Sequence, residues 1–134
     1  MKIRRRILVL CLCAFLVFSF SVAVYASASK TFFTVIRSGY SCTGQGKIVD
    51  NVATAYFKGT PKLMEQIIPQ EACTSQAVVQ VYDIYGVYIG GANTLNESSV
   101  TATATYTAGR DISYTTSFFV FNGDFFGFYR LDKK

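Results

Sequence analysis

Two aromatic runs separated by the dipeptide Asn122-Gly123 close the sequence and limit the folds that are open to it. Phe118–Phe121 precedes the dipeptide, and Asp124–Tyr129 follows it. Asn-Gly is the favoured dipeptide of a two-residue type I′ turn, because both residues adopt positive φ at low cost. The pattern therefore predicts an antiparallel β-hairpin at this end of the chain.

The preceding sequence also has the two-residue period of β-strands. In Val100–Tyr106, apolar residues alternate with Thr101, Thr103 and Thr105. Further strands are expected at Thr31–Arg37, Tyr40–Val49, Val52–Phe57, Ala77–Tyr82 and Val87–Ile89, with a hairpin connection at Asp50-Asn51 and a break at Gly90–Asn93. About seven or eight strands, with a turn every 8–12 residues, are typical of a small antiparallel β-sandwich.

One segment has no strand pattern. Residues 61–68 could form a short helix, with Thr60 as N-cap, Pro61 in the first turn and Pro69 beyond its end. An irregular crossing between two sheets is the alternative, because eight residues do not form a stable helix alone.

The N-terminal residues 1–28 have the order of a secretory signal peptide. Four basic residues lead into the apolar run Ile7–Val24, and small residues follow at Ala26-Ser27-Ala28. Cleavage is expected after Ala26 or Ala28, leaving a secreted domain over residues 29–134. The apolar run is long for a signal peptide, so an uncleaved membrane anchor is the alternative.

Removing this segment changes the charge balance. Four of the thirteen basic residues lie within it, and nine bases then face eight acids, a net charge of +1. A basic surface for nucleic acid is therefore not expected. The sequence contains no histidine, which argues against His-based catalytic triads and most zinc sites.

Cys42 and Cys73 are the two cysteines outside the signal peptide. An even pair in an exported chain predicts one disulfide. Closing this loop would stabilise the fold by about 3–4 kcal/mol. The alternative is a reactive thiol or a pair of metal-ligating cysteines. Outside the signal peptide there is neither a third cysteine nor a histidine to complete such a site, so no metal or cofactor is expected.

The hairpin register assigns its side chains to two faces. Tyr114, Thr116, Phe118 and Val120 are expected to face the core, together with Phe125, Gly127, Tyr129 and Leu131. The opposite face then carries Phe119, Phe121, Phe126 and Phe128, with Arg130 at its border. These five residues are the candidate interaction surface.

Four exposed phenylalanines would match or exceed the largest apolar patch of a typical monomer, so something should cover them. Cover from within the chain could come from Phe32 and Phe33, or from Leu63, Met64, Ile67 and Ile68. Otherwise the surface should meet a protein partner, a second copy of the chain or a membrane.

No set of catalytic residues is expected. Asp83 lies in an apolar run and could act as a general acid if buried, but an aspartate facing solvent at the strand end is the simpler interpretation. No second carboxylate can be placed beside it. Gly44-Gln45-Gly46-Lys47 lacks the spacing of a phosphate-binding loop and is interpreted as a turn.

In layout, the chain resembles the small, exported, single-disulfide β-rich proteins of Gram-positive bacteria. The resemblance rests on an early cysteine (Cys42), an Ala/Thr strand (Val100–Tyr106) and a terminal aromatic hairpin. More distantly, it resembles small β-sandwich bacteriocins.

Our hypothesis is therefore a secreted, non-enzymatic β-sandwich that acts by protein binding or self-association through its aromatic hairpin. A secreted antimicrobial protein acting on a membrane or cell wall is the alternative. A small carboxylate-based hydrolase using Asp83 ranks third.

Overall fold

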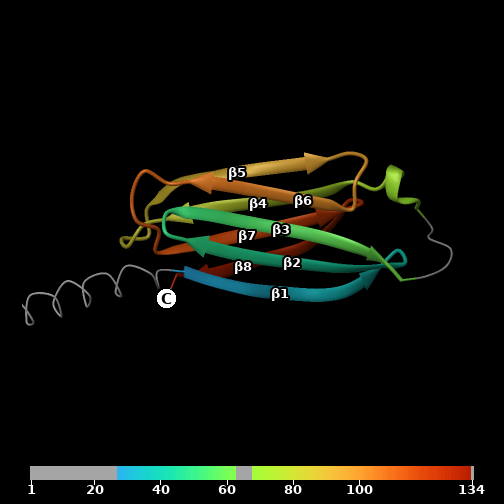
Figure 1. Ribbon diagram of the computed structural model, residues 1–134, viewed down its shortest axis with the longest axis horizontal. Helices are drawn as coiled ribbons and strands as arrows, with labels where there is room; N and C mark the ends of the chain where they lie inside the picture. Colours follow the sequence, from blue (N-terminus) through green and yellow to red (C-terminus); the bar gives the residue numbers. More distant parts are fainter. Residues whose placement is uncertain (1–26, 63–67, 134) are drawn as a thin grey trace, which may run out of the picture.

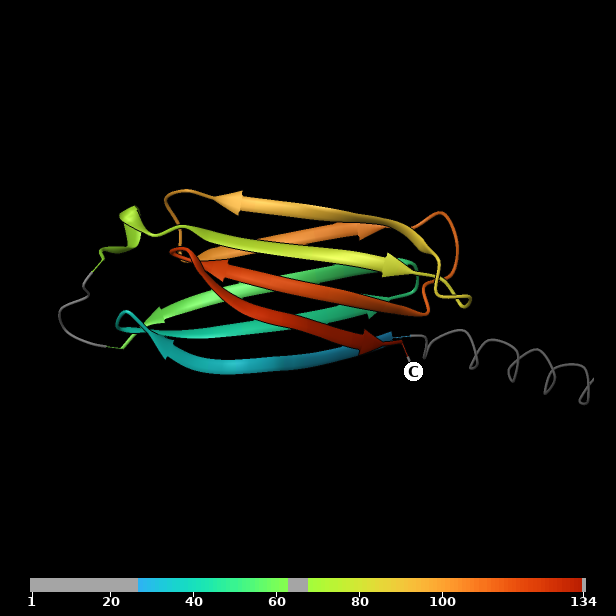
Figure 2. The same cartoon turned by 180° about the vertical axis from the view of Figure 1, so that it is seen from behind.

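The computed structural model describes residues 27–62 and 68–133 and confirms the predicted all-β sandwich. Its eight strands are β1 (Ser27–Arg37), β2 (Tyr40–Val49), β3 (Val52–Pro61), β4 (Ser75–Tyr82), β5 (Tyr88–Asn96), β6 (Thr101–Thr107), β7 (Tyr114–Phe121) and β8 (Asp124–Asp132). They form two antiparallel four-stranded sheets, sheet A in the order β1-β2-β3-β6 and sheet B in the order β5-β4-β7-β8. Sheet A lies toward the viewer in Figure 1, and sheet B in Figure 2.

The core combines small residues of β3 and β6 with large aromatic rings from both sheets. Ala53, Ala55, Ala102 and Ala104 line the inner side of β3 and β6, where they are buried. The Ala/Thr alternation thus has the predicted orientation, because Thr103 and Thr105 are exposed. The largest fully buried rings come from both sheets: Tyr40 and Phe57 from sheet A, and Phe119 and Phe121 from sheet B.

Both predicted two-residue hairpin turns are present. Asn122 and Gly123 have φ values of 49° and 84°, the positive values of a type I′ turn, and Phe121 pairs with Asp124. Asp50, with φ of 53°, likewise begins the turn between β2 and β3.

Strand β5 does not end at Gly90, contrary to the prediction. It continues through Gly90 and Gly91 to Asn96, paired throughout with β4. A Cβ at Gly90 would overlap the hydroxyl of Tyr106, which donates a hydrogen bond to the Ile89 carbonyl (3.0 Å). Glycine allows this close approach between the sheets, so here it continues the strand.

The predicted turn at Gly44–Lys47 is also wrong, since these residues lie within β2. Gly44 and Gly46 face the core, where a Cβ would overlap the rings of Phe33 and Phe32, respectively. A register shift between Thr31 and Phe33 accompanies this packing. The two glycines thus let the β1 aromatics lie directly against the backbone of β2.

The expected short helix at 61–68 falls largely on residues 63–67, which lie outside the described residues. Pro61, expected in its first turn, is instead the last residue of β3. A 3-10 turn, η1 (Gln70–Ala72), follows before β4. Among the described residues, no helix is long and apolar enough to cross a membrane.

The predicted disulfide is not formed, and both Cys42 and Cys73 are buried free thiols. Cys42 lies on β2 in sheet A, whereas Cys73 lies directly before β4 in sheet B. Facing sheets pack about 10 Å apart, more than the roughly 4.4–6.8 Å that a disulfide spans between Cα atoms. The Cys73 sulfur instead lies 3.4 Å from the Pro69 carbonyl oxygen.

Candidate interaction surface

Strand β7 presents its faces in the reverse of the predicted orientation, whereas at the far end of β8 Phe128 and Arg130 face outward and Tyr129 and Leu131 lie toward the core, as predicted. Phe119 and Phe121 are fully buried, and Ser117 and Thr115 are buried with them. This side of β7 faces sheet A, and Phe119 lies 6.3 Å from the Phe57 ring of β3 between ring centroids. Phe119 and Phe121 are therefore core residues and are excluded from the interaction surface.

A bulge in β8 determines which residues share the outer face. Phe118 pairs with Phe128 and Val120 with Phe125, so Phe126 and Gly127 together oppose the single residue Phe119. Gly127 has φ of 99°, a conformation that glycine adopts without strain. The bulge moves Phe128 and Arg130 to the outer face and turns Tyr129 toward the core.

Cover from within the chain, one of the predicted alternatives, is confirmed for Phe126. The ring of Phe33 stacks on Phe126 at 4.9 Å between centroids, and Phe33 also contacts Phe119 edge-on at 5.7 Å. Phe126 is thus partly buried against the core. Of the other residues expected to give cover, Ile68 packs on the core, and 63–67 lie outside the described residues.

Three phenylalanines form a cluster on the outer face of sheet B. The ring centroids of Phe118, Phe125 and Phe128 lie 5.2–5.8 Å apart, with edge-on or tilted contacts throughout. Phe125 is 53% exposed and Phe128 68% exposed. We call these three residues the Phe cluster. The prediction that Phe118 and Phe125 face the core is therefore wrong. The sequence signal that could have revealed the bulge is Gly127, a glycine inside a strand.

A second aromatic group lies on the same face, nearer the β4–β5 loop. Tyr82 and Tyr114 stack at 4.7 Å with an interplanar angle of 6°, and Tyr88 meets Tyr82 edge-on at 5.7 Å. The guanidinium of Arg130 lies 3.8 Å from the centre of the Tyr114 ring, and it also pairs with the Asp132 carboxylate (2.9 Å). Arg130, a predicted surface residue, is therefore exposed and held in place.

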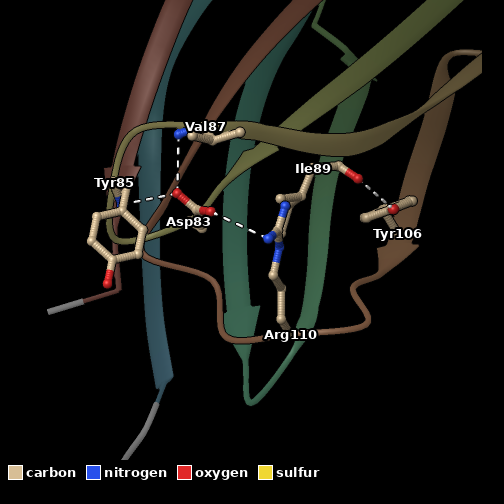
Figure 3. A network of polar contacts seen from close by, with 6 residues as sticks. All are labelled: Asp83, Tyr85, Val87, Ile89, Tyr106 and Arg110. Carbon is tan, nitrogen blue, oxygen red and sulfur yellow. Dashed lines mark hydrogen bonds and ion pairs between the residues drawn. The ribbon is translucent and has the colours of Figure 1, made fainter.

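The β4–β5 loop extends this apolar surface to the end of the sandwich. Ile84 and Tyr85 are 70% and 83% exposed, and Val87 is exposed as well. Beneath them, one oxygen of Asp83 accepts hydrogen bonds from the backbone N–H groups of Tyr85 (2.9 Å) and Val87 (3.0 Å), as Figure 3 shows. The loop is therefore held in a fixed shape while its apolar side chains face water.

The network in Figure 3 also gives Asp83 a structural role. Its second oxygen lies 3.6 Å from the Arg110 guanidinium, and the aspartate is only 6% exposed. One oxygen thus holds the loop, and the other pairs with Arg110 of the β6–β7 connection. The prediction of a solvent-facing aspartate is wrong.

Exposed apolar side chains are unevenly distributed between the two sheets. Within residues 27–62 and 68–133, nine large hydrophobic side chains are exposed, and seven of them belong to sheet B or its β4–β5 loop: Ile84, Tyr85, Val87, Tyr88, Leu95, Phe125 and Phe128. Two lie on sheet A, Ile36 and Val49. Among the described residues, no group of three or more potential ligands could hold a metal ion. The outer face of sheet B is thus the surface best suited to apolar contact.

Comparisons with known proteins assign no family. No protein-family model matches the sequence, and neither does any curated protein. A solved hypothetical protein from Pyrococcus horikoshii OT3 is similar over 72% of this chain and 94% of its own, at 8% identity and a TM-score of 0.41. IRMA from Escherichia coli gives 14% identity, coverage of 74% and 80%, and a TM-score of 0.27.

A glycosyl hydrolase family 2 member from Bacteroides cellulosilyticus is similar over 81% of this chain but 14% of its own, at 6% identity and a TM-score of 0.29. With TM-scores below 0.5, none of these similarities bears on activity. The function has to be argued from this chain's own surfaces.

Proposed function

We propose that this chain is a secreted, non-enzymatic binding protein that associates with a second copy of itself through the outer face of sheet B. The observation that carries the proposal is the Phe cluster, in which three adjacent rings lie on a face without a covering segment among the described residues. Phe125 and Phe128 alone leave on the order of 200 Å² of apolar surface in water.

Symmetry favours a second copy as the occupant. In a two-fold dimer the same patch serves both partners, so one apolar face is sufficient for a closed assembly. Aromatic residues and arginine are enriched in protein interfaces, and this face carries the Phe cluster, the stacked tyrosines and Arg130. Each partner of a standard interface buries roughly 800 Å², so a dimer would use this four-stranded face beyond the Phe cluster itself.

Secretion rests on the N-terminal sequence pattern. Strand β1 begins at Ser27, directly after the first predicted cleavage site, and Ala28 pairs with Ile48. Cleavage after Ala26 would leave all eight strands in the exported product, whereas cleavage after Ala28 would remove the first two residues of β1. An uncleaved segment would instead anchor the same domain at the membrane surface.

The test is the mass of the exported chain in solution, compared with that of a variant carrying both Phe125→Ser and Phe128→Ser. Both side chains are more than half exposed, so the variant should keep its fold while losing the cluster. We expect dimers to form with rising concentration in the natural chain and not in the variant. Ile36→Ser is the matched control, because Ile36 is 64% exposed on sheet A.

A second candidate function, membrane-directed antimicrobial action, is favoured by the β4–β5 loop. Ile84 and Tyr85 project from a rigid support at one end of the sandwich, where they could enter a lipid interface. Dye release from anionic vesicles, lost in Ile84→Ser/Tyr85→Ser, would support this function. Intact vesicles and undisturbed indicator cells would contradict it.

A further inference from the structure

The outer face of sheet A has a different chemistry from that of sheet B. Its four strands contain no acidic residue, and the register places Lys47 and Lys58 on this face, while Lys30, opposite the core-facing Gly46, lies at the exposed edge of β1. The strands of sheet B contain one base, Arg130, and the acids Asp124 and Asp132. The near-neutral net charge therefore conceals a basic face on sheet A.

Strand register gathers polar side chains into two rows across this basic face. Lys47 pairs with Ser29 of β1 and with Thr54 of β3. One step along the strands, Gln45 pairs with Thr31 and Tyr56. Neighbouring strands lie about 4.8 Å apart, so each row spaces its polar groups at that interval.

The two rows border a hollow in the surface. Its volume is about 380 Å³, and its lining includes Lys30, Thr31, Gln45, Lys47, Thr54 and Tyr56. A second hollow, of about 390 Å³, adjoins it, shares Lys47 and Thr54, and is otherwise lined by Val49, Val52 and the β2–β3 turn residues Asp50 and Asn51. Together they form a groove across β1, β2 and β3 toward the β2–β3 turn, on the face seen in Figure 1.

The groove walls are ordered and polar. Gln45 donates a hydrogen bond from Nε2 to Thr31 Oγ1 (3.4 Å), which fixes its amide across the β1–β2 pair. No ion pair between described residues involves Lys30 or Lys47. Both ammonium groups are therefore available to a negatively charged ligand.

We propose that this groove binds an acidic polysaccharide, with Lys47 and Lys30 pairing with its carboxylates. Hydroxyl and amide groups on both sides of the lysines match the hydroxyls of sugar rings. The half-buried ring of Tyr56 adds an apolar surface with a hydrogen-bonding end, which suits the mixed character of a sugar.

A carbohydrate fits this groove better than a phosphate chain does. Phosphate recognition commonly uses arginine forks or converging backbone N–H groups. The residues that line the groove include no arginine, and the backbone of β2 is paired on both sides in the sheet. The tyrosine and the side-chain hydroxyls are instead suited to sugar rings.

The test uses the chain that begins at Ser27, which retains both sheets. Calorimetry measures its binding to the acidic polysaccharide polygalacturonate. Neutral dextran and inorganic polyphosphate serve as comparison ligands. We expect binding to polygalacturonate, weakening as salt is added, and none to dextran. Lys47→Gln should reduce the affinity about fivefold, the upper range for one exposed charge pair. Tyr56→Ala should reduce it as well.

Lys62→Gln is the matched control, because it makes the same charge change just beyond the end of β3. Equal losses in Lys47→Gln and Lys62→Gln would overturn the proposed site, since they would indicate general charge attraction. The assignment of the ligand as a polysaccharide would be overturned by a different result. In that result, the chain binds polyphosphate with the same affinity as polygalacturonate, and Tyr56→Ala leaves the affinity for polyphosphate unchanged. Absence of any binding would overturn the proposal itself, without bearing on self-association through sheet B.

Discussion

At the scale of single residues, Asp83 determines the shape of the β4–β5 loop. Its carboxylate accepts two backbone N–H groups and pairs with Arg110 while almost fully buried. The local sequence favours a solvent-facing aspartate over a buried one, because the partner Arg110 lies 27 residues away in the sequence, in the β6–β7 connection. Such pairings depend on tertiary contacts.

Asp83→Ala should lower the free energy of unfolding by about 1–3 kcal/mol, because two N–H groups and Arg110 lose their acceptor. Urea denaturation measures this change. Asp111→Ala, at an exposed residue in the neighbouring connection, is the control and should change it by less than about 0.5 kcal/mol. Equal stability of the two variants would contradict the structural role of Asp83.

The buried thiol of Cys42 should make stability depend on alkaline pH. Burial raises the pKa of Cys42 from 9.0 to about 11. The unfolded chain therefore loses this proton first, so stability should be constant below about pH 9 and fall as the pH rises toward 11. Urea midpoints across this range measure the effect.

Tyr40, whose pKa burial raises to about 12, should add a similar fall at slightly higher pH. Cys42→Ser should make the decline shallower between pH 9 and 11 but leave the part that belongs to Tyr40. An identical pH dependence in the natural chain and in Cys42→Ser would contradict a protonated, buried Cys42.

At the scale of elements, most strand positions, both hairpin turns and the orientation of β6 followed from local sequence, whereas the orientation of β7 did not. Alternation identifies two faces of a strand but does not say which one is buried when both carry aromatics, as in β7. The opposing sheet determines which face is buried, because Gly44 and Gly59 of sheet A leave room for Phe119 and Phe121, respectively. The Gly127 bulge then moved Phe128 to the outer face.

The close packing of strand β5 against β6 at Gly90 can be tested by substitution. Gly90→Ala should destabilise the fold by about 1–3 kcal/mol, since the new methyl group would overlap Tyr106 at a φ of 148° that alanine rarely adopts. Gly109→Ala is the control, because a Cβ there meets nothing within 4 Å. Thermal unfolding should separate the two variants; equal melting temperatures would show that β5 and β6 do not pack this closely.

At the scale of the whole molecule, the two sheets present opposite chemistries. Sheet B and its β4–β5 loop carry most of the exposed large hydrophobic side chains, and sheet A carries four bases without an acid. Composition alone concealed this division, because a net charge averages over both faces. A molecule of this kind can associate through one face and keep the other free for a charged ligand.

The most direct test is the sedimentation mass of the chain that begins at Ser27, over a concentration series. We predict dimers that increase with concentration, persist when salt is added, and are lost in Phe125→Ser/Phe128→Ser but kept in Ile36→Ser. A monomer at every concentration, or dimers unaffected by the double substitution, would contradict the assignment of the Phe cluster as the interaction surface.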